Sequence, residues 1–213
     1  MRTLELFSGI GSVSQAFSEM GWEVISLDID PKFNPTLVAD IRTWDYTVYP
    51  PGHFHFVHAS PVCTPYSRAR TTAKTPRNLE LGDSLVIAAL RVIDHFAPPL
   101  GWTLETPETG LLKTRPFMEF RPILCDIDYC CMGLPYKKRT RFWGELPCEF
   151  ASHCCDSKSC PFVEGKKHIF TAQKMAAPGY AGDKGFKTAE LYALPERFCN
   201  LLASVVTRCS LLS

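Results

Sequence analysis

The sequence lacks several features that would assign it to a class at once. Its 213 residues contain no apolar run long enough to cross a bilayer and no apolar segment behind a basic N-terminus of the secretory kind. We therefore expect an intracellular protein without a membrane partner, in the nucleus if the host is a eukaryote. The net charge is only +1, so any argument for nucleic acid must come from local clusters of cations.

Cysteine, by contrast, is abundant, with ten residues in the chain. In the absence of a secretory signal we expect reduced thiols, metal ligands or catalytic groups rather than disulfides. Hydrophobic residues make up 46% of the sequence, which is enough for one good core. We therefore predict a single domain spanning residues 1–213.

Short apolar segments alternate with helical patterns along the chain. Strands are expected at residues 3–7, 23–27, 36–39, 54–59, 102–105, 125–130 and 141–145. Helices are expected at 13–20, at 81–96 and from about 195 onward. This alternation predicts an α/β fold with a mostly parallel sheet and helices on both faces, in which ligands bind at the carboxyl ends of the strands.

A glycine-rich turn, FSGIG at residues 7–11, follows the first strand. Glycine permits a tight turn and close approach of a ligand, although a turn without a ligand fits the motif equally well. The GxGxxG spacing of dinucleotide sites is absent, which disfavours a nicotinamide-dependent dehydrogenase. Asp28 or Asp30, after the second strand, could accept hydrogen bonds from a ribose or form a turn. Asp40 could contact an adenine amino group or cap a helix.

Cys63 lies in a proline-stiffened loop, SPVCTPYS, directly after a predicted buried strand. Arg68 and Arg70 follow it, and nearby cations lower a thiol pKa, so this cysteine is favoured as a nucleophile. Most of the other cysteines fit small buried side chains. Glu105 ends the next strand and could assist at a ring nitrogen or pair with Lys113 or Arg115.

These motifs together resemble the DNA cytosine-5 methyltransferase family, especially its small phage-type members. The segments that carry the resemblance occur in the family's order and cover almost the whole chain: LELFSGIGSVSQAF, SLDID, SPVCTPYS, LETPETGLL, GLPYKKRTRFWG and TAELYALPERFCNLLA.

The resemblance implies a Rossmann-like S-adenosylmethionine-dependent methyltransferase fold with a seven-stranded sheet, and methylation of carbon 5 of cytosine in DNA. Cys63 would add to C6 of a base that has left its stack, while Glu105 engages N3 and the exocyclic amine. Arg139 and Arg141 would hold the base or the backbone near Cys63. The cofactor would be bound by Phe7, Gly9, Ile10, Gly11, Asp28, Ile29, Asp40 and Pro61.

The chain also departs from the family pattern. Val62 is inserted between the usual Pro and Cys, and Thr106 stands where Asn is usual. Only residues 145–187 are available for the family's target recognition region. We therefore expect that this reduced insertion either confers no base-sequence specificity or leaves that specificity to a protein partner.

Two basic clusters flank the proposed site. The cations Lys137 and Lys138 precede Arg139, and Arg68 and Arg70 follow Cys63 and Ser67. Each cluster alone fits a solvated charged face, but their shared position predicts contacts to nucleic-acid phosphates by Ser67, Arg68, Arg70, Lys137 and Lys138.

Residues 148–168 are expected to form an irregular insertion rich in cysteine and histidine. Either these side chains are free thiols and imidazoles, or four of them bind a structural zinc ion: Cys148, Cys154, Cys160 and His168.

Two further readings stay open. An RNA cytosine methyltransferase, acting on tRNA, would share this fold and chemistry and would depend less on a recognition region. A binding module could instead retain the cofactor fold and nucleic-acid binding while having lost turnover.

Overall fold

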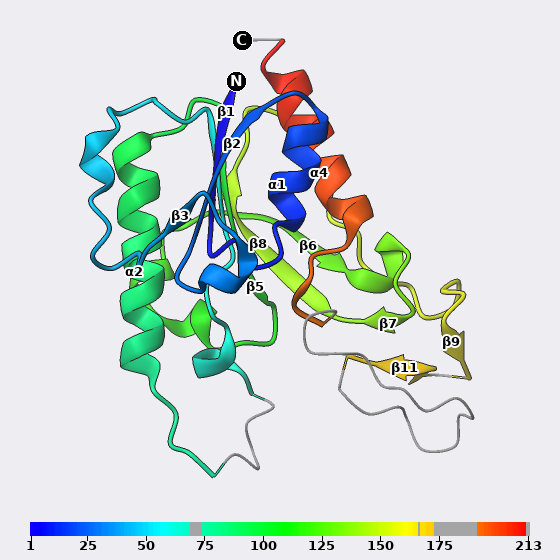
Figure 1. Cartoon of the computed structure of the whole chain (residues 1–213). Coiled ribbons are helices and arrows are strands. Elements are labelled where there is room, and N and C mark those ends of the chain that lie inside the picture. The colour runs from blue at the N-terminus through cyan, green and yellow to red at the C-terminus, as the bar shows by residue number, and fades with distance from the viewer. Residues whose placement is uncertain (69–73, 166, 173–190, 212–213) are drawn as a thin grey trace.

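The computed structural model describes residues 1–68, 74–165, 167–172 and 191–211. Its centre is a seven-stranded sheet with the order β3-β2-β1-β4-β5-β8-β6 (Figure 1). The strands are β1 Arg2–Leu6, β2 Glu23–Asp28, β3 Leu37–Val38, β4 Phe56–Ala59, β5 Trp102–Pro107, β6 Ile123–Asp128 and β8 Arg139–Glu145. The five strands β3, β2, β1, β4 and β5 are parallel to one another. Strand β8 lies between β5 and β6 and is antiparallel to both.

Helices cover both faces of the sheet (Figure 1). On one face α1, Ser12–Glu19, packs beside α4, Glu196–Cys209, and Trp22 Nε1 donates a hydrogen bond to Thr207 Oγ1 at 2.9 Å. The other face is covered by α2, Leu79–Phe96. Apolar residues at helical spacing on each helix face the sheet, so two hydrophobic cores form, one on each side.

Short elements connect this framework. They are the 3₁₀ helices η1 Pro31–Phe33, η2 Tyr46–Val48, η3 Thr64–Tyr66, η5 Leu112–Thr114, η6 Pro116–Met118 and η7 Tyr129–Met132, and the two-residue strands β7 Tyr136–Lys137, β9 Val163–Glu164, β10 Lys167–His168 and β11 Phe170–Thr171. The last four form two small ladders, β9 with β10 and β7 with β11. None of the helices in the described residues has both the length and the apolarity that a membrane span requires.

The predicted fold class is confirmed: the sheet has seven strands, is mostly parallel and carries helices on both faces. Boundaries differ most at the sixth predicted strand. The sequence pattern placed it at 125–130, whereas β6 covers Ile123–Asp128, because η7 begins at Tyr129.

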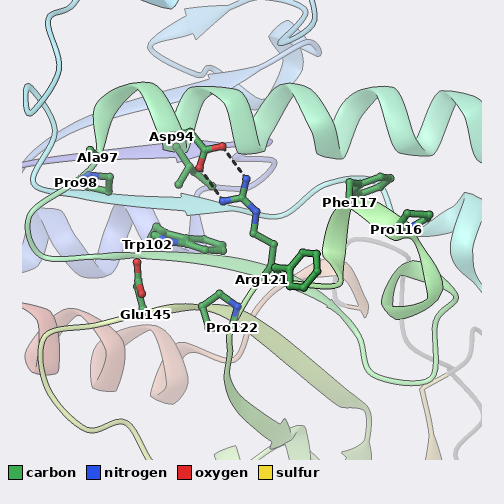
Figure 2. Close-up of a pocket in the computed structure, with 11 residues that line it drawn as sticks. Asp94, Ala97, Pro98, Trp102, Pro116, Phe117, Arg121, Pro122 and Glu145 are labelled. Atoms are coloured by element: carbon green, nitrogen blue, oxygen red, sulfur yellow. Dashed lines mark hydrogen bonds and ion pairs between the residues drawn. The ribbon is translucent and has the colours of Figure 1, made fainter.

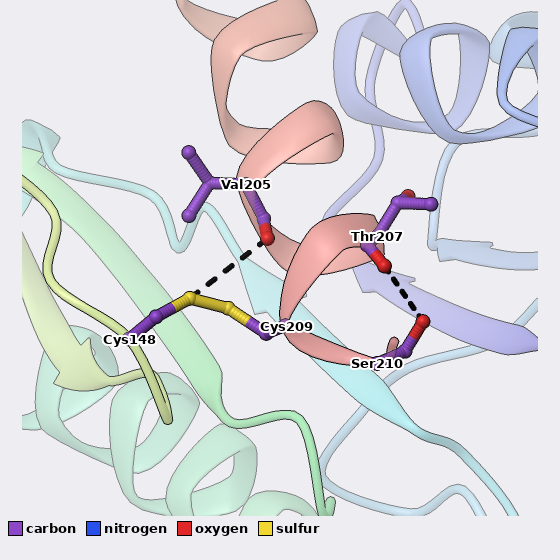
Figure 3. Close-up of a disulfide and its surroundings, with 5 residues drawn as sticks. All are labelled: Cys148, Val205, Thr207, Cys209 and Ser210. Carbon is purple, nitrogen blue, oxygen red and sulfur yellow. Dashed lines mark hydrogen bonds between the residues drawn. A yellow bond between two sulfur atoms is a disulfide. The ribbon is translucent and has the colours of Figure 1, made fainter. Parts of the chain in front are cut away.

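A disulfide joins Cys148, in the segment after β8, to Cys209 at the end of α4 (Figure 3). The two Cα atoms are 6.1 Å apart, within the range for this bond. The expectation that disulfides are absent is therefore wrong for this pair. The sequence offered no sign of it, because the two cysteines are 61 residues apart and meet only when α4 packs against the sheet.

Candidate active site

A cavity of about 330 Å³ lies at the carboxyl ends of β1, β2, β4 and β5. The residues that line it come from the ends of these strands, from the segments that follow them and from two later parts of the chain: Glu5, Phe7, Ser8, Gly9, Ile10, Ser12, Asp28, Ile29, Phe33, Ser60, Pro61, Val62, Cys63, Thr64, Glu105, Lys138 and Tyr192. Its volume falls in the range of small-molecule sites.

The glycine turn and the end of β2 form one wall of the cavity. Phe7, Gly9 and Gly11 have positive φ angles of 58°, 50° and 75°, so the chain turns sharply between β1 and α1. The N–H of Gly9 donates to Asp28 Oδ2 at 2.8 Å, and the N–H of Asp30 donates to Asp28 Oδ1 at 2.9 Å. Both carboxylate oxygens are thereby held in place, and each keeps a lone pair for a ligand hydroxyl.

Glu5 lies beneath this wall, inside β1. Its Oε2 accepts hydrogen bonds from the N–H of Ser14, at 2.8 Å, and from the Ser14 hydroxyl, so the carboxyl group caps the first turn of α1. The side chain is only 4% exposed, and this burial raises the pKa of Glu5 to about 7, with a smaller contribution from the negative charge of Asp28. Sequence reasoning missed this residue because a polar position within a short strand carries no motif.

Cys63 precedes η3 in the loop after β4, and its side chain is half-buried at the cavity. Burial raises the pKa of its thiol, the charge of Glu105 raises it further, and Lys138 lowers it. From the sequence, Arg68 and Arg70 were expected to lower the pKa of this thiol. Within the described structure Arg68 is exposed, and Arg70 lies outside the described residues.

Glu105 is buried near the end of β5 and lines the same cavity as Cys63. Burial raises the pKa of its carboxyl group, and the positive charge of Lys138 acts against this effect. Lys138 itself is fixed by donating to the Tyr129 hydroxyl at 3.2 Å and to the Leu191 carbonyl at 3.0 Å. The cation that both groups experience is therefore Lys138.

The alternative partners considered for Glu105 are bound to other carboxylates. Lys113 Nζ donates to Glu108 Oε1 at 2.7 Å, and Arg115 Nε donates to Asp83 Oδ1 at 3.0 Å. The reading of Glu105 as one half of a pair with Lys113 or Arg115 is thus excluded by the geometry.

His58, which sequence reasoning also missed, supports the loop that carries Cys63. It is fully buried in β4, where its ring nitrogens lie 2.7 Å from Thr103 Oγ1 and 2.9 Å from Ser60 Oγ. Burial lowers its pKa to about 3, so the ring is neutral. It holds Ser60, which lines the cavity, without adding charge there.

Sequence comparison decides the family. No model of a known protein family matches the chain. A probable DNA (cytosine-5)-methyltransferase of frog virus 3 (isolate Goorha) is 32% identical over 178 residues, which is 77% of this chain and 79% of that protein. The chain belongs to the DNA (cytosine-5)-methyltransferase family.

Solved structures agree on the fold of this methyltransferase. The S. pombe Dnmt2 methyltransferase matches 78% of the chain at 18% identity, and an E. coli prophage-encoded putative DNA modification methyltransferase matches 81% at 14% identity, each with a TM-score of 0.50. A DNMT2 mutant from Spodoptera frugiperda matches 99% at 14% identity, also with a TM-score of 0.50. The chain spans a little over half the length of the first two, 57% and 53%, and 98% of the third.

Six of the eight cofactor candidates line the cavity of the methyltransferase: Phe7, Gly9, Ile10, Asp28, Ile29 and Pro61. Gly11 and Asp40 do not line it. Gly11 is the residue before α1, and Asp40 is paired with Arg42, whose Nε lies 3.0 and 3.1 Å from its two carboxylate oxygens.

Arg139 and Arg141, the two arginines assigned to the catalytic group, are paired with β6 instead of lining the cavity. Arg139 donates to Asp128 at 3.1 and 2.6 Å, and Arg141 donates to Asp126 at 2.8 Å through each of two nitrogens. The antiparallel register of β6 and β8 brings these residues opposite each other. Neither arginine is brought to Cys63, and Lys138 lines the cavity in their place.

The nucleic-acid candidates within the described residues differ in their surroundings. Lys138 lines the cavity, Arg68 is exposed, and Ser67 is half-buried with its carbonyl accepting from Arg77 at 2.9 Å. Lys137 Nζ lies 3.7 Å from Asp128 Oδ2. The predicted phosphate contacts stay predictions.

The cysteine and histidine side chains assemble differently from the predicted zinc set. Four ligand atoms lie within 4.8 Å of one another, those of Cys130, Cys155, Cys160 and His168. Cys160 and His168 were in the predicted set. Cys148 is instead bound to Cys209, and Cys154 is exposed with its thiol 3.7 Å from the Asp126 carbonyl oxygen, so the predicted set is corrected at these two positions.

A second hollow, of about 780 Å³, lies at the other edge of the sheet, where β5 begins and β8 ends (Figure 2). Arg121 crosses it and is paired with both oxygens of Asp94 at 2.7 Å, with its guanidinium 5.9 Å from the Trp102 ring. Because its main cation is already neutralised by a carboxylate, this larger hollow offers no comparable chemistry.

Proposed function

We propose that this chain transfers a methyl group from S-adenosylmethionine to carbon 5 of cytosine in DNA, with Cys63 as the attacking nucleophile. The observation that carries the proposal is the shared cavity: Cys63 and Glu105 line the same hollow as the glycine turn and Asp28. Membership of the DNA (cytosine-5)-methyltransferase family supports the reaction type.

The cavity suits this cofactor better than a phosphate-bearing dinucleotide. Its acidic residues are Glu5, Asp28 and Glu105, and Lys138 is its one cation among the lining residues that the structure describes. Asp28 offers its two fixed carboxylate oxygens to the hydroxyl groups of a ribose, and a pyrophosphate would find one cation, Lys138, among these lining residues. Asp28 would hold the ribose hydroxyls, and Phe7 would contact the methionine part. When bound, S-adenosylmethionine supplies the methyl group that C5 receives.

The residues of the chain supply the rest of the chemistry. The Cys63 thiol first loses its proton to water, a step that Lys138 favours by lowering the pKa of the thiol. The thiolate then adds to C6 of the cytosine, forming a carbon–sulfur bond and directing the electrons of the C5–C6 double bond to C5. Burial raises the pKa of Glu105 and so favours the protonated carboxyl group, which can donate its proton to N3 as the ring accepts these electrons.

Lys138 stabilises the carboxylate that forms when Glu105 gives up this proton. After C5 is methylated, its proton passes to a base, the carbon–sulfur bond to Cys63 breaks and the double bond is restored. The proton on N3 then returns to Glu105.

The described residues include few elements that could recognise the base sequence around the target cytosine. In the described part of the segment after β8, the strands are β9 and β10, which form a small ladder, and β11, which pairs with β7. We propose that a protein partner supplies sequence specificity, as the short insertion at 145–187 led us to expect.

The test is covalent trapping on an oligonucleotide that contains 5-fluorocytosine, in the presence of S-adenosylmethionine. Fluorine at C5 cannot leave as a proton, so the enzyme should remain joined to the base. We expect an adduct with DNA that maps to Cys63, no adduct with Cys63→Ser, and an undiminished adduct with the exposed-cysteine control Cys154→Ser. No adduct despite cofactor binding would support the binding module, and an adduct with RNA alone would support the RNA enzyme.

A further inference from the structure

The four clustered ligand residues come from three separate parts of the chain. Cys130 is in η7, directly after β6, Cys155 and Cys160 are in the loop that follows the disulfide cysteine Cys148, and His168 is in β10. Their ligand atoms nevertheless lie within 4.8 Å of one another. The chain therefore folds back twice to bring three thiols and one imidazole to one point.

The distances within the cluster fit a tetrahedral metal site. His168 Nε2 lies 3.6 Å from Cys155 Sγ and 3.5 Å from Cys160 Sγ. Zinc binds thiolate sulfur at about 2.3 Å and imidazole nitrogen at about 2.0–2.1 Å, so a regular tetrahedron places sulfur and nitrogen about 3.5 Å apart. The two measured separations match this value.

The backbone around the ligands is fixed by hydrogen bonds. The N–H of Cys155 donates to Asp128 Oδ2 at 2.7 Å, and Asp128 is completely buried. The pairing of His168 with Val163 in the β9–β10 ladder, and the hydrogen bond from Val163 to the Cys160 carbonyl at 3.2 Å, hold the other two ligands. The cluster is therefore built by several independent contacts.

The surrounding loop also needs a cross-link to hold it. The described side chains between 151 and 165 are exposed or only partly buried. The apolar contacts with the core come from residues on either side of this stretch, Leu146, Cys148, Phe150, Phe170 and Ala172. A segment without a core of its own is typically stabilised by a metal or a disulfide. The four ligand atoms of the cluster would supply such a cross-link.

We propose that Cys130, Cys155, Cys160 and His168 bind one Zn²⁺ ion in a closed, structural site. With four protein ligands the ion has no open position for water or substrate, so its role is to hold the loop against η7. Tyr129 in η7 binds Lys138, which lines the cavity of the candidate active site. The zinc site thus supports one wall of that cavity without taking part in the chemistry.

The first test measures metal in the full chain, purified under reducing conditions without a chelator. We expect about one zinc ion per chain by mass spectrometry of the elements. Cys155→Ser and Cys160→Ser should lower the zinc content at least roughly tenfold. Cys154→Ser removes an adjacent, exposed thiol outside the cluster and should leave the zinc content unchanged.

The second test keeps the proposal falsifiable if the ligand variants fail to fold. Wild-type protein stripped of metal is titrated with Co²⁺, and we expect the intense absorption of a tetrahedral site with thiolate-to-cobalt charge transfer. Absence of both zinc and this absorption in reduced wild-type protein would overturn the proposal. So would a disulfide among Cys130, Cys155 and Cys160 under the same conditions, or a loss of zinc from Cys154→Ser as large as that from Cys155→Ser.

Discussion

The cavity at the strand ends and the cysteine-rich segment after β8 are held in place by different means. The cavity residues follow buried strands, so the sheet and its two cores position them. The described side chains of the cysteine-rich segment between 151 and 165 are exposed or partly buried, and the segment is joined to α4 by a disulfide and brings three side chains beside Cys130. The candidate site thus lies on the rigid part of the molecule, and the disulfide helps to hold a segment that is little buried.

The largest expected effect is a loss of kcat when a residue that lines the cavity is replaced. Glu105→Gln removes the proton donor but keeps the shape of the side chain, and general acid catalysis typically contributes about 10²–10⁴-fold. We expect kcat to fall by about this factor, with little change in cofactor affinity, measured by transfer of a labelled methyl group to DNA. Glu108→Gln, whose carboxylate binds Lys113 outside the cavity, is the matched control and should change kcat less than about threefold. Equal losses in both variants would contradict the role of Glu105.

The disulfide should matter for stability and not for the cavity. A cross-link between residues 61 apart stabilises by roughly 4 kcal/mol through the unfolded chain. We expect Cys148→Ser to lower the free energy of unfolding by about that amount in denaturant titrations, while S-adenosylmethionine affinity is retained. Reductant should destabilise the wild type and have no further effect on the variant. A variant as stable as the oxidised wild type would show that the cross-link adds nothing.

A smaller effect on the free energy of unfolding, which depends on pH, is expected from Glu5 beneath the cavity. Its folded pKa of about 7 lies above the ordinary value of 4.5, so the folded state favours the protonated form. The resulting stability is fully present below pH 4.5 and is lost as pH rises through about 7. At about 1.4 kcal/mol for each pKa unit, the loss is roughly 3 kcal/mol.

Glu5→Gln stays neutral and should escape this loss. The free energy of unfolding of the variant minus that of the wild type should therefore rise between pH 4.5 and pH 8, as followed by denaturant titration at each pH. A difference that does not change with pH would mean that the carboxyl group titrates near its ordinary value when folded.

The two regions also differ in how far the sequence predicted them. The seven strands and the positions of Cys63, Asp28 and Glu105 follow from apolar periodicity, because parallel strands end at one edge of the sheet. The pairing of Arg139 with Asp128 could not be predicted, since it depends on the antiparallel register of β8 with β6. Glu5 was missed because its partner, Ser14, is known only when α1 packs on β1.

The ligand set of the cysteine cluster could not be selected from spacing. Six cysteine and histidine residues between 148 and 168 allow many tetrads, and Cys130, which belongs to the observed one, lies outside that stretch. Cys148 is removed from the choice only by the position of Cys209 at the end of α4. Both outcomes depend on tertiary contacts between distant segments.

The position of α4 has a consequence for how the molecule folds. This helix packs beside α1, which follows directly after β1 and lies far from α4 in the sequence (Figure 1). The core on this face of the sheet therefore depends on contacts between distant segments. Because such contacts require closure of a large loop before they stabilise the chain, we expect slower folding than for a domain of similar size built from local contacts.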